Sequence, residues 1–98
     1  MVVAISKFVV SNGMEREVTE AFINRPRKVE NAPGFIRLEV LSPSENRSEF
    51  WLVTYWEDQA SFEHWHKNHR HESHDLIPKG LKLDPRGTEL RIFQHIAS

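Results

Sequence analysis

A histidine-rich stretch is the most chemically distinctive part of this chain. The sequence holds 6 histidines, and all but His95 lie between His64 and His74. Neutral imidazole is a good ligand for transition metals and for haem iron. For any single one of these residues, however, a solvated helix face is the commoner explanation. No cysteine and no His-Glu-x-x-His pattern accompanies them, so a zinc centre has no further support.

Trp65 lies inside the same stretch and offers a flat apolar surface beside the histidines. Phe62 and His69 stand at i−3 and i+4 from it, so the three share one face of a helix. A tryptophan on a helix most often anchors a core. A Trp and a His beside a hydrophobic sheet would also form the wall of a cavity for a flat aromatic ligand.

Ser6 is a polar residue within an otherwise apolar segment, and we expect its hydroxyl to bond to the backbone. The chain lacks a Gly-rich phosphate loop, a Gly-x-Ser-x-Gly elbow and a paired-carboxylate motif, which disfavours hydrolase and nucleotide-dependent activities. Its net charge of −1 gives no reason to expect nucleic acid or a membrane surface as a partner. We expect no signal peptide or membrane span, and therefore a cytoplasmic protein.

Alternation, apolar spacing and turn residues predict the elements that position these side chains. The 98 residues fit one domain, 1–98. Its expected elements are a strand at Val2–Val10, a helix at Met14–Asn24, a short helical piece at Arg27–Glu30, strands at Phe35–Leu41 and Phe50–Trp56, a helix capped by Glu57-Asp58 that weakens beyond Asn68, a loop at Leu76–Gly87 and a strand at Thr88–Ile96. This β-α-β-β-α-β order is the α+β ferredoxin-like arrangement, with an antiparallel sheet.

The strand Phe50–Trp56 is apolar at nearly every position, which bears on assembly. Helices on one face of an antiparallel sheet leave its other face uncovered. An exposed apolar face of that size is unusual for a monomer. We therefore expect a homodimer that packs sheet against sheet.

Three segments together resemble the antibiotic biosynthesis monooxygenase (ABM) family. They are Val29–Phe35 (VENAPGF), Phe50–Glu57 (FWLVTYWE) and Ala60–Trp65 (ASFEHW), and the likeness covers nearly the whole chain. The resemblance implies a dimeric α+β barrel. Within the family the chain looks most like haem-degrading monooxygenases of the IsdG kind. That likeness implies that haem is both substrate and cofactor, and that the reaction consumes dioxygen and electrons from an external donor. A reductase is a further candidate partner.

The same resemblance assigns roles to individual residues. His74 matches the proximal haem ligand, and Trp65 matches the residue that bends the porphyrin. Ser6 stands where haem-degrading members carry an Asn that bonds the iron-bound oxygen, and a serine hydroxyl is a shorter donor. Further candidates for the pocket are Phe22, Phe35, Phe62 and His69.

Helix geometry sets a condition on this site. At ~100° a residue, Trp65 and His74 fall on opposite faces of one straight helix. Both can face one pocket only if the helix breaks, with Lys67-Asn68 the expected point, whereas His69 suits an unbroken helix. Two other functions stay open: a cofactor-independent ABM oxygenase of a polycyclic phenol or quinol, and a non-enzymatic small-molecule binder.

Overall fold

A computed structural model describes residues 1–25, 27–68 and 78–98 of the chain. In chain order its elements are β1 (Val2–Val9), α1 (Glu15–Ile23), the 3-10 helix η1 (Val29–Asn31), β2 (Phe35–Leu41), β3 (Glu49–Trp56), α2 (Gln59–Asn68) and β4 (Glu89–Gln94). The expected β-α-β-β-α-β order is confirmed. Within the described residues, no helix is long and apolar enough to cross a membrane.

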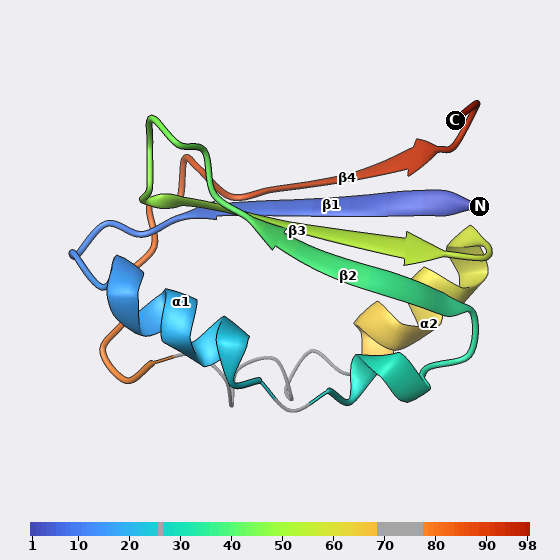
Figure 1. Ribbon diagram of the computed structural model, residues 1–98, viewed down its shortest axis with the longest axis horizontal. Helices are drawn as coiled ribbons and strands as arrows, with labels where there is room; N and C mark the ends of the chain where they lie inside the picture. The colour runs from blue at the N-terminus through green and yellow to red at the C-terminus, as the bar shows by residue number, and fades with distance from the viewer. Residues whose placement is uncertain (26, 69–77) are drawn as a thin grey trace.

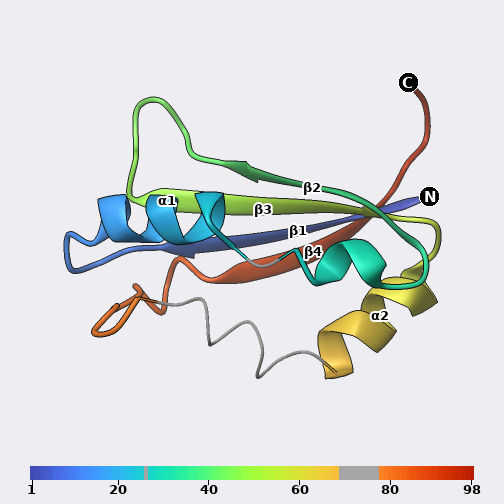
Figure 2. The same ribbon diagram turned by 60° about the horizontal axis from the view of Figure 1, so that its bottom comes forward.

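The four strands form one antiparallel sheet in the order β2-β3-β1-β4. Both α1 and α2 lie against the same face, at opposite ends of the strands (Figure 1). Figure 2 shows the same layering after rotation, with η1 beside α2. The expected hairpin between β2 and β3 is confirmed, and β4 lies at the edge beside β1.

Two elements have a boundary that differs by more than one residue from the sequence prediction. The short helical piece is a 3-10 turn at Val29–Asn31 rather than a helix over Arg27–Glu30, and Ala32 beyond it is extended, as a residue before proline prefers. The last strand ends at Gln94 rather than Ile96, because Gln94 pairs with Val2 at the very start of β1. Pro26, expected to begin the short piece, lies outside the described residues.

The start of α2 is fixed by a cap and by a close contact with the turn before β2. Asp58 Oδ1 accepts a hydrogen bond of 2.8 Å from the Ser61 N–H, which satisfies a free donor of the first turn. The Ser61 side chain, together with this backbone hydrogen bond, lowers the pKa of Asp58. Gly34 has φ +81°, and its carbonyl accepts a 2.8 Å bond from the Glu57 N–H. The expected cap is therefore confirmed at Asp58.

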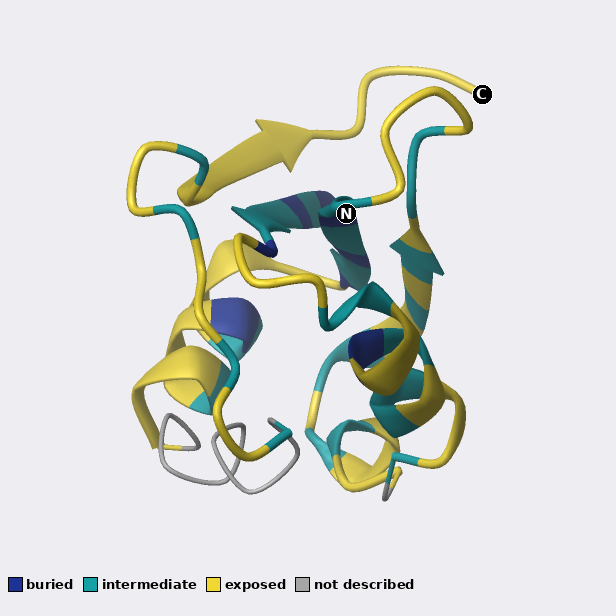
Figure 3. Cartoon of the chain, turned by 90° about the vertical axis from the view of Figure 1, so that its left-hand side faces the viewer, coloured by how far each residue is buried: buried dark blue, intermediate teal, exposed yellow. Residues whose placement is uncertain are grey.

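Among the described residues, every buried one except Val53 belongs to one of two clusters, one under each helix. The cluster near α2 consists of Val2, Ala4, Trp56 and Phe62. The cluster near α1 consists of Val10, Val18 and Phe50. Burial is concentrated on the helix-facing side of β1 and β3, whereas all of β4 is exposed (Figure 3).

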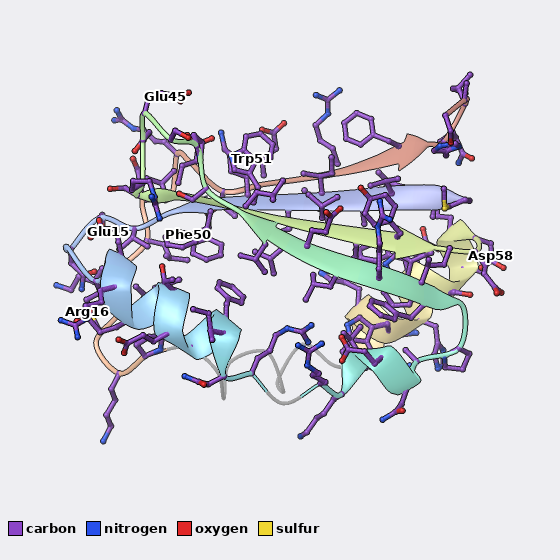
Figure 4. All side chains as sticks on the ribbon, in the orientation of Figure 1. Glu15, Arg16, Glu45, Phe50, Trp51 and Asp58 are labelled. Atoms are coloured by element: carbon purple, nitrogen blue, oxygen red, sulfur yellow. The ribbon has the colours of Figure 1, made fainter. Side chains whose placement is uncertain are left out.

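Within residues 1–25, 27–68 and 78–98, no helix lies on the opposite side of the sheet, as the sequence predicted. Consecutive residues on β3 show the two faces: Phe50 points toward α1, and Trp51 points away from the helices (Figure 4). We call this second side the open face. By strand register it carries three residues from each strand: Val3, Ile5, Lys7, Arg37, Glu39, Leu41, Trp51, Val53, Tyr55, Glu89, Arg91 and Phe93.

Candidate functional site

Ser6 interrupts the helix-facing row of β1. Ala4 before it belongs to the cluster near α2, and Phe8 after it packs on the cluster near α1. Its strand partners on either side are Leu52 and Leu90. The Ser6 side chain is half-buried, so this one hydroxyl lies where the apolar layer under the helices divides.

Ser6 Oγ has no hydrogen-bond partner among the described residues, so the expected bond to backbone is wrong. Its neighbours across the two adjacent strands are Leu52 and Leu90, whose apolar side chains offer no acceptor. Thr54 on β3 shows the alternative, since its hydroxyl donates to the Ala4 carbonyl at 3.2 Å. Among the described residues, the Ser6 hydroxyl is therefore available to donate a hydrogen bond to another group on the helix-facing side.

Trp65 lies on α2 and packs, partly buried, against the cluster that contains Trp56 and Phe62. Phe62 itself is 7% exposed and meets Trp56 edge to face with ring centroids 5.8 Å apart. His66 stacks on the outer side of Phe62 at 5.4 Å. Part of the Trp65 side chain therefore packs against the core, and the remaining part stays exposed.

The three phenylalanines named as pocket residues do not come together. Phe22 belongs with Phe8 and Phe50 at the α1 end, with ring centroids 6.2 and 6.3 Å away. Phe35 lies at the α2 end, edge to face on Trp56 at 5.4 Å, as Phe62 does. The structure therefore places Phe22 on one side of Ser6 and the other two on the opposite side.

Two apolar residues of β4 extend this region and were missed as site candidates. Leu90 is 46% exposed and Ile92 36%, and both lie on the helix-facing side by their pairing with Ser6 and Ala4. Their alternation in the sequence indicated a shared face, but only the strand order shows that this face adjoins Ser6. Together with Ser6 they form an apolar strip with one hydroxyl.

The described histidines of α2 make no metal centre. His64 and His66 are exposed, and the Asn68 side-chain amide lies 3.2 Å from the His64 ring. Within residues 1–25, 27–68 and 78–98, no cluster of three or more metal-binding side chains occurs. His69 and His74 lie outside the described residues, so their roles and the break near Asn68 stay predictions.

Three hydrogen bonds hold the turn after β1 to the chain that follows the histidine stretch. The Asn12 side-chain amide donates to the Gly80 carbonyl at 2.8 Å, and the Ser11 hydroxyl donates to the Lys82 carbonyl at 3.1 Å. The Ser11 N–H makes a second bond of 2.9 Å to Lys82. This contact, which we call the turn latch, fixes where the chain returns to the sheet after residue 77.

An ion pair joins the end of α1 to η1. Arg25 Nη2 lies 2.8 Å from Glu30 Oε1, and the Arg25 side chain is only 13% exposed. The hydrogen bond from Arg25 lowers the pKa of Glu30. The pair holds together the two segments on either side of residue 26.

Comparison with known proteins places this chain in a family. The family model described as antibiotic biosynthesis monooxygenase matches residues 1–74. Two haem oxygenases described as mycobilin-producing, from two strains of Mycobacterium tuberculosis, are each 34% identical over 64 residues. The match covers 65% of this chain and 61% of theirs, so it spans less than two thirds of those relatives.

Solved structures agree with the fold over the whole chain. The haem degrader MhuD from Mycobacterium tuberculosis, solved with two haems in its active site, has a TM-score of 0.76 at 27% identity and covers 100% of this chain and 98% of its own. SnoaB from Streptomyces nogalater, a cofactor-independent oxygenase, has a TM-score of 0.75 at 18% identity, covering 99% of this chain and 94% of its own. The second likeness shows the fold alone.

Proposed function

Because the chain belongs to the antibiotic biosynthesis monooxygenase family, we propose that it is a haem-binding oxygenase that opens the porphyrin ring and releases iron. It would consume dioxygen and electrons from an external donor. The haem oxygenases at 34% identity support this chemistry. The structural observation that carries the proposal is the strip of Ser6, Leu90 and Ile92, an apolar surface whose one hydroxyl has no partner in the described part of the chain.

The described residues fit a flat apolar group with one polar centre. Leu90 and Ile92 offer uncovered apolar area on the helix-facing side, and contact with a porphyrin ring would remove it from water. The Ser6 hydroxyl has no partner among the described residues to compete with a ligand. Trp65 adds an indole surface from α2. A site that is mostly apolar with few polar groups is the usual form of a cofactor pocket.

The chain's own residues would hold and shape the ring. His74 is proposed as the residue that would ligate the iron, with His69 its substitute if α2 continues unbroken. Trp65 would press against the ring, and Ser6 would donate a hydrogen bond to the bound group. Phe35 and Phe62 would support Trp65 from the core. Bound haem supplies the iron that activates dioxygen.

Phe22 takes a different part in this proposal. It lies with Phe8 and Phe50 under α1, away from the indole of Trp65. It would close the opposite end of the apolar strip rather than contact the same part of the ring. Its contribution would be to exclude water from that end.

We further propose that the protein is a homodimer through the open face. That face carries Trp51, Tyr55 and Phe93, and Phe93 is 38% exposed. A second copy is the simplest way to cover so much apolar surface.

Haemin titration tests the proposed activity. Purified protein is expected to give a saturable Soret band when stoichiometric haemin is added. Addition of ascorbate is then expected to drive degradation of the bound haem, so that the band disappears. His74→Ala should lose the band, while His64→Ala, which removes an exposed histidine of α2, should keep it. Absence of a band from the wild-type protein would overturn the proposal.

The alternative is a cofactor-independent oxygenase of a polycyclic quinol. One observation favours it: Ser6 stands where haem-degrading relatives were expected to carry a longer amide donor. This activity would be identified by oxygen uptake when a quinol is supplied without added haem. The His74→Ala variant should retain that oxygen uptake.

A further inference from the structure

The turn after β1 contains a pair of residues with a chemistry of its own. Asn12 is followed by Gly13, whereas every other asparagine of the chain precedes a larger residue. In an Asn-Gly pair the glycine nitrogen can attack the side-chain carbonyl carbon of the asparagine, because glycine has no Cβ to obstruct the approach and its backbone turns freely. The sequence therefore places a candidate site of spontaneous amide loss in this turn.

The structure leaves the attacking nitrogen accessible. Asn12 and Gly13 are both exposed, so water reaches the two residues. A Cβ built at Gly13 would meet nothing within 4 Å, and its φ of +78° is a conformation that glycine adopts readily. Among the described residues, the Gly13 N–H donates no hydrogen bond. No such bond therefore has to break before this nitrogen reacts.

The Asn12 amide has a structural task that its loss would end. Its Nδ2 donates to the Gly80 carbonyl at 2.8 Å. The other two bonds of the turn latch both end on the Lys82 carbonyl, and next to them the Asp84 N–H donates to the Val9 carbonyl at 2.8 Å. These bonds pair the two segments in antiparallel order. The Asn12 bond closes the end of the series that lies farthest from β1 along the chain.

From these observations we propose that Asn12 is a self-modification site whose reaction opens the turn latch with time. The Gly13 nitrogen forms a bond to the Asn12 Cγ. The side-chain nitrogen leaves as ammonia and takes the proton of the Gly13 N–H, which yields a cyclic succinimide. Water then opens this ring at either carbonyl, giving an aspartate or an isoaspartate. The net change is the uptake of one water and the release of one ammonia, so no oxidant takes part.

Either product removes the donor of the latch. A carboxylate only accepts hydrogen bonds, and at position 12 it would face the Gly80 carbonyl, which also only accepts. An isoaspartate in addition lengthens the main chain of the turn by one atom. Leu81 lies between the two latch acceptors and packs against the cluster near α1, so an open latch weakens the hold on that contact. Because the amide does not form again, the chain loses stability in one direction only.

Ageing of the purified full chain at neutral pH tests the chemistry. Trypsin cleaves after Lys7 and Arg16, so Asn12 is the only asparagine of its peptide. Mass spectrometry is expected to show that this peptide exchanges an amide for an acid, and isoaspartyl methyltransferase should methylate it. The peptide with Asn46, another exposed asparagine, is the internal control and should stay unchanged, because Arg47 follows it. Asn12→Gln should not age, since its longer side chain would have to close a larger ring.

Calorimetry and hydrogen exchange on the same samples test the effect on the latch. Aged wild-type protein and fresh Asn12→Asp are each expected to melt about 4–8 °C below fresh wild type, because each has lost one hydrogen bond. Amide exchange at Ser11 and Asp84 should quicken in both, whereas that at Glu57, at the α2 end of the sheet, should not. An Asn12 peptide that converts no faster than the Asn46 peptide would overturn the proposed site. Conversion with no fall in melting temperature would overturn its link to the latch.

Discussion

Gly34 is the residue whose replacement most directly tests how α2 is positioned. Its φ of +81° is a conformation that an L side chain rarely adopts, which costs about 1–2 kcal/mol for alanine. A Cβ there would also lie 2.6 Å from Ser61 Cβ, on the first turn of α2. Such overpacking typically costs about 1–3 kcal/mol. Gly34→Ala is therefore expected to lower the free energy of unfolding by about 2–5 kcal/mol.

Two other glycines supply matched controls. Gly13 has φ +78° and Gly80 φ +84°, and a Cβ at either would meet nothing within 4 Å. Gly13→Ala and Gly80→Ala should therefore lose only the backbone part, about 1–2 kcal/mol. For a chain of this size 1 kcal/mol shifts the melting temperature by about 4–8 °C, so scanning calorimetry separates the two classes.

The double variant with Ser61 completes this test. Ser61→Gly removes the side chain that the new Cβ would meet, so Gly34→Ala combined with Ser61→Gly should lose less than the sum of the two single effects. If Gly34→Ala melts at the same temperature as Gly13→Ala, the steric argument is refuted and Gly34 does not position α2 through Ser61.

Further predictions concern the cap, the latch, the core and Ser6. The lowered pKa of Asp58 gives stability that is present above its unfolded pKa and lost as pH falls, so urea unfolding of Asp58→Asn should show a weaker acid dependence than wild type. Asn12→Ala removes the 2.8 Å turn-latch bond and should cost about 1 kcal/mol in the same assay. Trp56 Nε1 is buried without a partner in the described chain, so Trp56→Phe should cost less than the ~3–5 kcal/mol of a large truncation, because it also removes that donor. Ser6→Asn should speed ascorbate-driven loss of the Soret band, and Ser6→Ala should slow it; equal rates would exclude Ser6 as a donor.

Local patterns were sufficient to predict most of the elements. The β-branched segment before Ser11 became β1, and Asp58 caps α2 as its residue type favours. The run of Phe50–Trp56 predicted a strand that is apolar at nearly every position, and β3 carries large side chains on both faces. These features depend on residues close in sequence, which is why single-chain reasoning recovers them.

Long-range placement was the part that the sequence could not supply. The separation of Phe22 from Phe35 follows from α1 and α2 lying at opposite ends of the sheet, and no spacing in the sequence encodes that distance. The position of Ser6 between Leu52 and Leu90 depends on the order of the strands in the sheet. Each of these is a property of the assembled sheet.

The divided core connects the fold to the proposed function. A continuous apolar layer under α1 and α2 would stabilise the chain more, but it would leave no uncovered surface beside Ser6 for a ligand. The two small clusters instead leave Leu90 and Ile92 exposed, and a domain of this size has little stability in reserve. A ligand that binds only the folded chain adds about 2.7 kcal/mol at one hundred times its dissociation constant. If haem fills the strip, haemin should therefore raise the melting temperature of the wild-type protein. It should raise that of a Leu90→Asp variant much less, because the charge removes apolar contact without altering either cluster.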